Sequence, residues 1–263
     1  MIDALASEWL KLRSVRSTWH ILGAVVAFVL LMAGFTFYVG SLWDGLPAGQ
    51  RATLRAAQPE RLILMPAQIC LAVLGVLTMT SEYATGMIRT SLVAVPRRHT
   101  VLAAKAAVVA AVALVAGEVS VFVTFFTGRA IIGDRLIRDF AAPMAEELPK
   151  LFATGLSVPM LAMVGLGLGA VLRSTAGAIT TVVGLLFVVP RFVVFLPSPW
   201  NARVGSVLPE DLTLQAAGEV PLAVGLGKAA GVGLSPAAAL TVMALYAVAA
   251  LGTGAVMFTR TDV

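Results

Sequence analysis

Long apolar runs alternate with short polar connections along the whole chain. Six runs are long enough to cross a membrane, at residues 19–43, 62–80, 101–127, 151–172, 176–196 and 236–258. Each holds about 19 to 27 residues, against the roughly 20 that a helix needs to cross the hydrocarbon core. A backbone in lipid must satisfy its own hydrogen bonds, so we expect helices. The pattern predicts an all-α integral membrane protein with six transmembrane helices, in which Pro66, Pro159 and Pro190 mark kinks or helix ends.

The segment before the first span, residues 1–18, has a helical pattern of its own. Apolar residues recur every three or four positions, at Ile2, Leu5, Trp9 and Leu12. Polar residues fall on the other side, at Asp3, Ser7, Lys11 and Ser14. This pattern favours an amphipathic helix that lies in the membrane interface. The alternative is a plain extension of the first span.

The connection before the last span, residues 197–235, is too long for a simple turn. It contains the Gly-rich apolar stretch "VPLAVGLGKAAGVGL", which Lys228 interrupts. Such a segment can dip into the bilayer and return where protein covers its backbone. We therefore expect a re-entrant outer element, with a seventh span or a surface loop as the alternatives.

Composition supports a single transmembrane domain over residues 1–263. The chain is 59% hydrophobic and 13% charged, with a mean hydropathy of +0.93, whereas soluble domains average about 25% charged residues. The net charge of +5 comes from basic residues scattered between apolar runs, which indicates anionic lipid rather than nucleic acid as the partner. Basic residues are denser in the connections that lie inside if both termini are cytoplasmic, so we expect that orientation.

Motifs for catalysis or nucleotide binding were not found in the sequence. The stretch "GLGKAAG" at 225–231 only superficially resembles a phosphate-binding loop, because Ala follows the Lys and the glycine spacing is wrong. We find no HExxH, CxxC or Asp-rich metal motif. The chain is therefore expected not to hydrolyse ATP by itself and to bind no cofactor or metal, and a membrane enzyme is the least favoured class.

Glu118 is the one acidic residue deep within an apolar run, "ALVAGEVSVFV". A charge there costs several kcal/mol unless it is paired or neutralised, which points to a functional role. Arg191 lies at a comparable depth in the fifth run and is the candidate partner. The alternative is a protonated or hydrogen-bonded packing residue.

Small residues line one wall of the fourth run. Gly165, Gly167 and Gly169 in "GLGLGAVL" lie close to Ala162 in the sequence. Small residues let helices approach closely in lipid, so we expect tight packing on this wall.

Polar chemistry is concentrated in the connection between the second and third runs, residues 81–100, "SEYATGMIRTSLVAVPRRHT". Pro96 limits a helix there to about residues 83–95, and Glu82, Gly86 and Arg89 would share one face of it. Arg97, Arg98 and Lys105 would hold the end of the loop against lipid headgroups. The alternative is that these charges only set the topology.

The chain resembles the permease subunits of bacterial two-component ABC (ATP-binding cassette) exporters, also called type-2 ABC permeases. The resemblance is carried by "SEWLKLRSVRSTW" near the N-terminus, by "SEYATGMIRTSLVAVPRR" with the following "LAAK", and by the terminal "FTRTDV". It implies a multi-pass protein of the bacterial cytoplasmic membrane, with both termini cytoplasmic, working as a homodimer or a pseudo-dimer. It also implies a separate ATPase subunit that carries ATP and magnesium.

The resemblance further implies that the 81–100 loop is a cytoplasmic coupling helix for that ATPase. The residues expected to contact or orient the ATPase are Glu82, Tyr83, Gly86, Met87, Arg89, Leu92, Arg97 and Arg98. The function expected is export of a hydrophobic or amphipathic cargo. An ATP-independent secondary transporter or channel is the alternative, because six helices alone would allow it.

Overall fold

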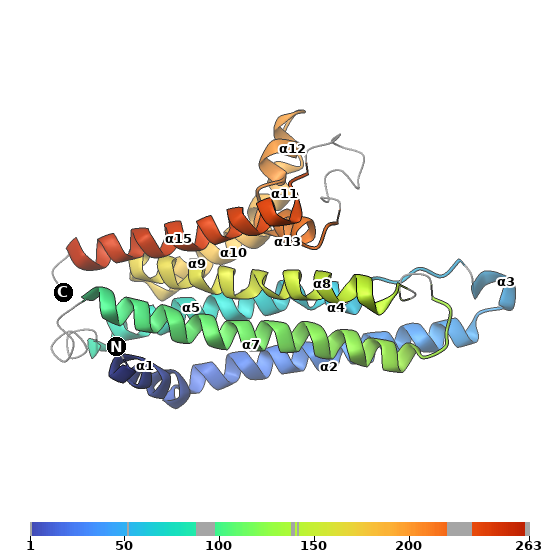
Figure 1. Cartoon of the computed structure of the whole chain (residues 1–263), viewed down its shortest axis with the longest axis horizontal. Coiled ribbons are helices and arrows are strands. Elements are labelled where there is room, and N and C mark those ends of the chain that lie inside the picture. Colours follow the sequence, from blue (N-terminus) through green and yellow to red (C-terminus); the bar gives the residue numbers. More distant parts are fainter. Residues whose placement is uncertain are drawn as a thin grey trace.

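The computed structural model describes residues 2–51, 53–87, 98–137, 140, 142–219 and 233–260. Regular structure in this part of the chain is entirely helical, which confirms the predicted fold class. Most helices run side by side along one axis and form an elongated bundle (Figure 1).

Six helical segments are long and apolar enough to span a membrane, and they match the predicted runs to within a few residues at most ends. They are α2 (Arg16–Gly45), α4 (Pro59–Leu62) with α5 (Leu64–Thr85), α7 (Arg98–Ile132), α8 (Met144–Gly155) with α9 (Ser157–Leu172), α10 (Thr175–Val183) with the π-helical segment η2 (Gly184–Val188) and α11 (Val189–Val193), and α15 (Pro236–Arg260). Four shorter helices are α1 (Ile2–Ser14), α3 (Ala48–Arg51), α12 (Trp200–Gly205) and α13 (Pro209–Ala216). The chain is thus a multi-pass membrane protein.

The three prolines that the sequence marked as kinks or helix ends occur where helices begin. Pro66 and Pro159 are the third residues of α5 and α9, and Pro190 is the second residue of α11. A proline in the first turn removes an N–H that has no intrahelical acceptor, so it is tolerated there. The spans are therefore interrupted at these points rather than lost, as predicted.

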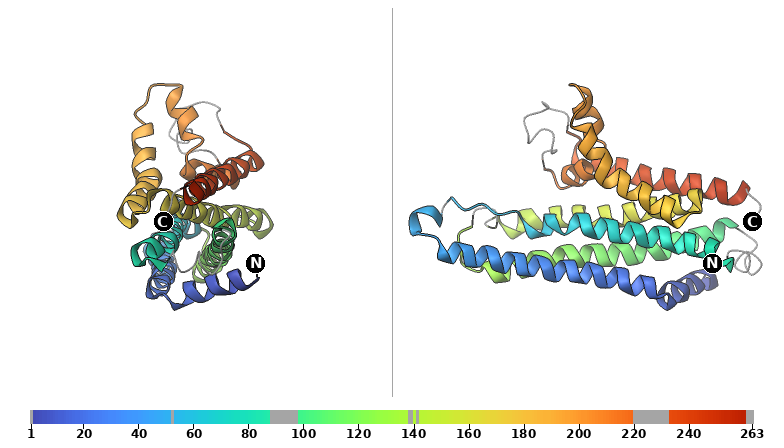
Figure 2. Two further views of the ribbon diagram at one scale, coloured as in Figure 1. Left: turned by 90° about the vertical axis from the view of Figure 1, so that its left-hand side faces the viewer. Right: turned by 180° about the vertical axis from the view of Figure 1, so that it is seen from behind.

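Both ends of the described chain lie at the same end of the bundle as the last turn of α5 and the first turn of α7 (Figures 1 and 2). We call this the termini end. Part of the way along the bundle, beside the end of α15 that is farther from the termini, α11 and α12 leave the bundle as an arm (Figure 1). Phe195 and Trp200 on this arm are exposed.

The core is built on very close packing of α5 against α9. A Cβ atom added at Gly75 would lie 2.1 Å from the carbonyl oxygen of Ala162, and one added at Gly165 would lie 2.1 Å from that of Ala72. Gly167 meets the backbone of Ala250 on α15 in the same way. The predicted small-residue wall is confirmed as the surface where backbones touch, because glycine alone leaves the space.

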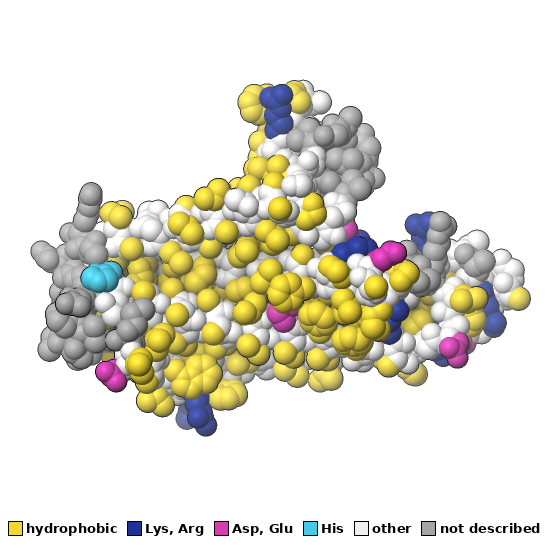
Figure 3. Space-filling model, viewed as in Figure 1, with side chains coloured by type: hydrophobic (Ala, Val, Ile, Leu, Met, Phe, Trp, Pro, Cys, Tyr) yellow, Lys and Arg dark blue, Asp and Glu magenta, His cyan; other side chains and the backbone are white. Residues whose placement is uncertain are grey.

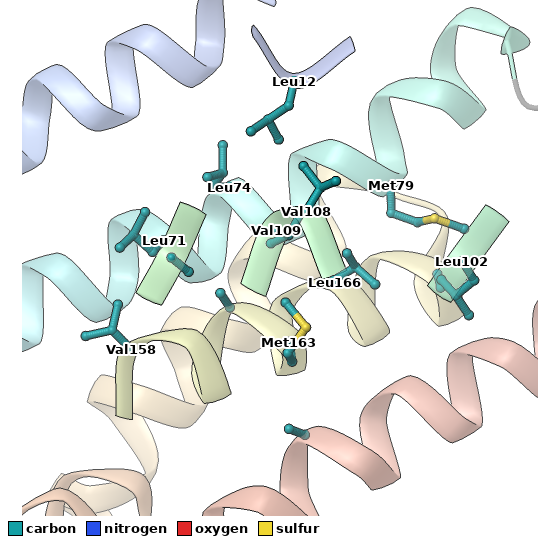
Figure 4. Packing of buried hydrophobic residues seen from close by; sticks show 14 of the residues in the cluster. Leu12, Leu71, Leu74, Met79, Leu102, Val108, Val109, Val158, Met163 and Leu166 are labelled. Atoms are coloured by element: carbon teal, nitrogen blue, oxygen red, sulfur yellow. The ribbon is translucent and has the colours of Figure 1, made fainter. Parts of the chain in front are cut away.

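Around this contact, α1, α5, α7, α9 and α15 form one hydrophobic core cluster (Figure 4). Leu71, Val109 and Leu166 in this cluster are fully buried. The face of the bundle seen in Figure 3 is also largely apolar. An apolar exterior is unfavourable in water and is what a lipid-facing surface requires.

Candidate functional site

The termini end holds four charged side chains in one cluster. Glu8 and Lys11 come from α1, Glu82 from the last turn of α5, and Lys105 from the beginning of α7. We call these four residues the charge cluster. They converge because α1 lies against α7 and presents Ala4, Glu8 and Leu12, spaced four residues apart, as its buried face.

Each lysine of the charge cluster bridges both glutamates. The Nζ atom of Lys105 lies 2.5 Å from Glu8 Oε2 and 2.8 Å from Glu82 Oε1. The Nζ atom of Lys11 lies 2.7 Å from Glu8 Oε1 and 3.0 Å from Glu82 Oε1. Two positive and two negative charges cancel, which offsets the cost of taking them out of water.

Burial differs strongly within the charge cluster. Glu82 and Lys105 are each 3% exposed, whereas the Lys11 side chain is 25% exposed. Partial burial by itself lowers the pKa of Lys11, but hydrogen bonds and charge from Glu8 and Glu82 outweigh it. The net result is a pKa of Lys11 above its ordinary value, so this lysine stays charged at neutral pH.

The last turn of α5 is also held from its other side. The guanidinium of Arg173 lies 5.2 Å from the centre of the Tyr83 ring, and it donates a hydrogen bond to the carbonyl of Met257 on α15. Arg173 caps the C-terminus of α9 with a left-handed φ of 52°. The end of α5 is thus fixed to α9 and α15 as well as to α1 and α7.

The structure corrects the predicted helix over residues 83–95. α5 continues through Thr85, and Gly86 ends it with a left-handed φ of 71°. Glu82 and Gly86 therefore belong to the end of a spanning helix and do not share a face of one continuous helix with Arg89. Arg89, Leu92 and Arg97, and the side chain of Arg98, lie outside the described residues, so their coupling role stays a prediction.

Two charged residues have a different environment from the one predicted. Glu82 was expected to face the ATPase and Lys105 to face lipid headgroups, but both are buried and paired with each other. Because each is the other's counterion, neither is offered to an outside partner. Met87, in contrast, lies within the predicted loop and is exposed.

The predicted ion pair between Glu118 and Arg191 is not formed. Arg191, on α11, instead pairs with α13, where its Nη1 atom lies 3.3 Å from Glu210 Oε2. Both carboxyl oxygens of Glu118 are buried without a hydrogen-bond partner among the described residues. They lie against Gly155, where an added Cβ would meet Glu118 Oε2 at a separation that is too short for contact.

Gly155→Ala is expected to destabilise the protein by about 1–3 kcal/mol, because the new methyl group overlaps the Glu118 carboxyl group. The double variant Gly155→Ala/Glu118→Ala should recover most of this loss, since the truncated side chain makes room. Thermal unfolding of purified protein in mild detergent measures both effects. Equal losses in the single and double variants would show that Glu118 is not what Gly155 accommodates.

α13, in the connection from α11 to α15, packs against α15 and α8. Leu212 and Gln215 of α13 are buried. The side-chain amide of Gln68 on α5 donates to the hydroxyls of Ser157, at 2.7 Å, and Thr213, at 3.2 Å. The described part of residues 197–235 is thus two short helices, of which α13 is anchored inside the fold, while residues 220–232 lie outside the described part.

A comparison with known protein families gives one match. The family described as ABC-2 family transporter protein matches residues 4–193. The chain belongs to the ABC-2 transporter family. The match includes α1, the whole charge cluster and the first five spans. No curated protein matches the chain.

Membership of the ABC-2 family makes the chain a membrane permease subunit of an ABC transporter, a class that works with an ATP-binding subunit. The charge cluster then lies on both sides of the connection that the sequence predicts for that subunit. Glu8 and Lys105 were missed as members of a site. The sequence feature that could have indicated Glu8 is its spacing of three residues from Lys11, which puts an acidic and a basic side chain on one face of α1.

Proposed function

We propose that this chain is the membrane-spanning subunit of an ATP-driven exporter and that residues 81–100 receive a separate ATP-binding subunit. The observation that carries the proposal is the family match together with the charge cluster. Glu82 lies at the start of this connection and Lys105 follows it, and they are joined by an ion pair of 2.8 Å. A connection whose two ends are fixed to each other and to α1 can transmit a force instead of yielding to it.

The buried residues of the charge cluster and the residues of the loop then have separate tasks. Glu82 and Lys105 position the loop, while Met87, Arg89 and Leu92 provide the contact with the ATP-binding subunit. Apolar and Arg side chains are common anchors in protein interfaces. Arg97 and Arg98 would lie near anionic headgroups. ATP and magnesium belong to the partner.

The proposal places the termini end on the cytoplasmic side of a bacterial cytoplasmic membrane, with α1 lying at its interface. It includes a second copy of the chain, since one bundle so closely packed at Gly75 and Gly165 leaves little room for a cargo path. It also includes entry of the 197–235 segment into the outer part of the bilayer. The cargo class is a hydrophobic or amphipathic compound, in keeping with largely apolar spans.

A photo-cross-linking amino acid at Leu92 is expected to capture the ATP-binding subunit when the two proteins are co-expressed. The same amino acid at Leu196, which lies between α11 and α12 on the arm and away from the termini end, is the matched control and should capture none. Cross-linked pairs are identified in isolated membranes by mass spectrometry. Equal capture at both positions, or none at Leu92 in a complex that still transports, contradicts the coupling role of the loop.

Arg89→Ala/Leu92→Ala should reduce transport-coupled ATP hydrolysis at least tenfold and leave the thermal stability of the isolated permease unchanged. Transport without any ATP-binding subunit would instead favour a secondary transporter.

A further inference from the structure

A cavity of about 140 Å³ lies between α5, η2 and α13. It lies where the fifth span diverges from the bundle: α10 packs against α5 and α9, whereas η2 continues into α11 and the arm (Figure 1). π-helical segments inside α-helices are frequent at functional sites. A cavity of roughly 150 Å³ is enough to hold benzene. The space between these helices is therefore large enough for one six-membered ring.

The wall of this cavity is mostly apolar, and its charges are already paired. Its apolar side chains are Leu64, Met65, Leu186 and Leu214. Arg61 and Glu210 also line it. However, Arg61 Nη2 lies 2.5 Å from Glu219 Oε1, and Glu210 Oε2 lies 3.3 Å from Arg191 Nη1. One basic and one acidic residue, each with its own counterion, favour neither a cation nor an anion, so the wall suits an uncharged group.

Gln68 of α5 places a carboxamide of fixed orientation in the same wall. Its Nε2 atom uses both hydrogens, because it donates to the hydroxyls of Ser157 at 2.7 Å and Thr213 at 3.2 Å. These hydroxyls give their own hydrogens to the carbonyl oxygens of Thr154 and Pro209. They can therefore only accept from Gln68, which fixes the side of the amide on which its nitrogen lies.

The side-chain oxygen of Gln68 is left as an acceptor without a donor. The described residues provide no hydrogen bond to Oε1, and this atom is not one of the enclosed polar atoms that lack a partner, so it remains accessible. Water molecules would find few polar partners in a cavity with so apolar a wall. The acceptor is better satisfied by a single neutral donor on an otherwise apolar ligand.

We propose that this cavity binds an uncharged, ring-sized apolar group that carries one O–H or N–H donor, such as a phenol, with Gln68 Oε1 as the acceptor. Ser157 and Thr213 hold the amide in place before the ligand arrives, so the site is preformed. A ring without the donor leaves the oxygen unsatisfied, which weakens its binding. A charged ring finds no unpaired counterion. Binding is a property of the isolated permease and does not depend on the ATP-binding subunit.

The test follows the methyl group of Met65, which lines the cavity, by carbon-13 NMR of methionine-labelled protein in detergent. Phenol should shift the Met65 signal saturably, whereas anisole, the same ring without the O–H donor, should bind at least fivefold more weakly. Benzoate should not bind. Affinities refer to the free ligand, which equilibrium dialysis against the same detergent gives for each compound. Equal affinities for phenol and anisole, or no saturable shift with phenol, would overturn the proposal.

Two variants separate the acceptor from the space around it. Gln68→Met removes the oxygen, so the preference for phenol over anisole should fall below twofold, a ratio that a purely structural role would not change. Leu214→Phe fills the cavity and leaves Gln68 in place, so phenol binding should weaken at least tenfold. Leu62→Phe, at a 40% exposed residue outside the cavity wall, is the matched control and should leave binding unchanged.

A preference for phenol that persists in Gln68→Met contradicts the role of the oxygen. Full phenol binding in Leu214→Phe contradicts the site itself, and this test stands even where Gln68→Met fails to fold.

Discussion

Lys105→Met is expected to destabilise the protein by about 3–5 kcal/mol, which is the cost of leaving buried charges without their partner. Lys105 is 3% exposed, and its Nζ atom lies closer to both Glu8 and Glu82 than the Nζ atom of Lys11 does. Its loss leaves two buried carboxylates with only Lys11 between them. Equilibrium unfolding in mixed detergent, or the fraction that stays monodisperse after heating, measures the effect.

Lys11→Met is the matched control for this variant, because Lys11 contacts the same two glutamates but is 25% exposed. Its loss should cost about 1 kcal/mol or less, since water screens a partly exposed pair. Glu8→Gln added to Lys105→Met restores neutrality, and the combined loss should be smaller than the sum of the two single losses. Additive losses would show that the four residues do not act as one cluster.

Gly165→Ala is expected to destabilise the protein by about 3 kcal/mol or more, or to prevent folding. The added Cβ would lie 2.1 Å from the carbonyl oxygen of Ala72, and this neighbour is a backbone atom that cannot rotate away. α5 and α9 must separate, which disrupts the packing around Leu71 and Leu166. The yield of monodisperse protein and the unfolding temperature are the measurements.

The control for the glycine prediction is Gly34→Ala on α2. Nothing lies within 4 Å of a Cβ atom at that position, so the change should stay within about 0.5 kcal/mol. Gly75→Ala, which would bring a Cβ to within 2.1 Å of Ala162, should behave like Gly165→Ala. If Gly34→Ala and Gly165→Ala are equally harmful, close approach does not explain the glycine at position 165, because helix propensity alone favours Ala over Gly at both positions.

The sequence by itself determined the spans and much of their packing. An apolar run of some 20 residues in lipid must be a helix, because its backbone has no other partner. The six predicted runs therefore correspond to six helical segments. The small-residue wall could also be found from the sequence. Gly165 and its neighbours allow another backbone to approach closely, whichever helix packs against them.

Only the tertiary structure decided which charges meet. Glu8 and Lys105 are 97 positions apart, and Lys11 and Glu82 are 71 apart. Their pairing depends on how α1 lies across the ends of α5 and α7, which no local pattern specifies. Equal depth in the membrane suggested Glu118 and Arg191 as partners, but depth says nothing about the side of the bundle that a residue faces. A charge binds whatever side chain the packed helices bring within a few ångströms, so its partner is set by the fold as a whole.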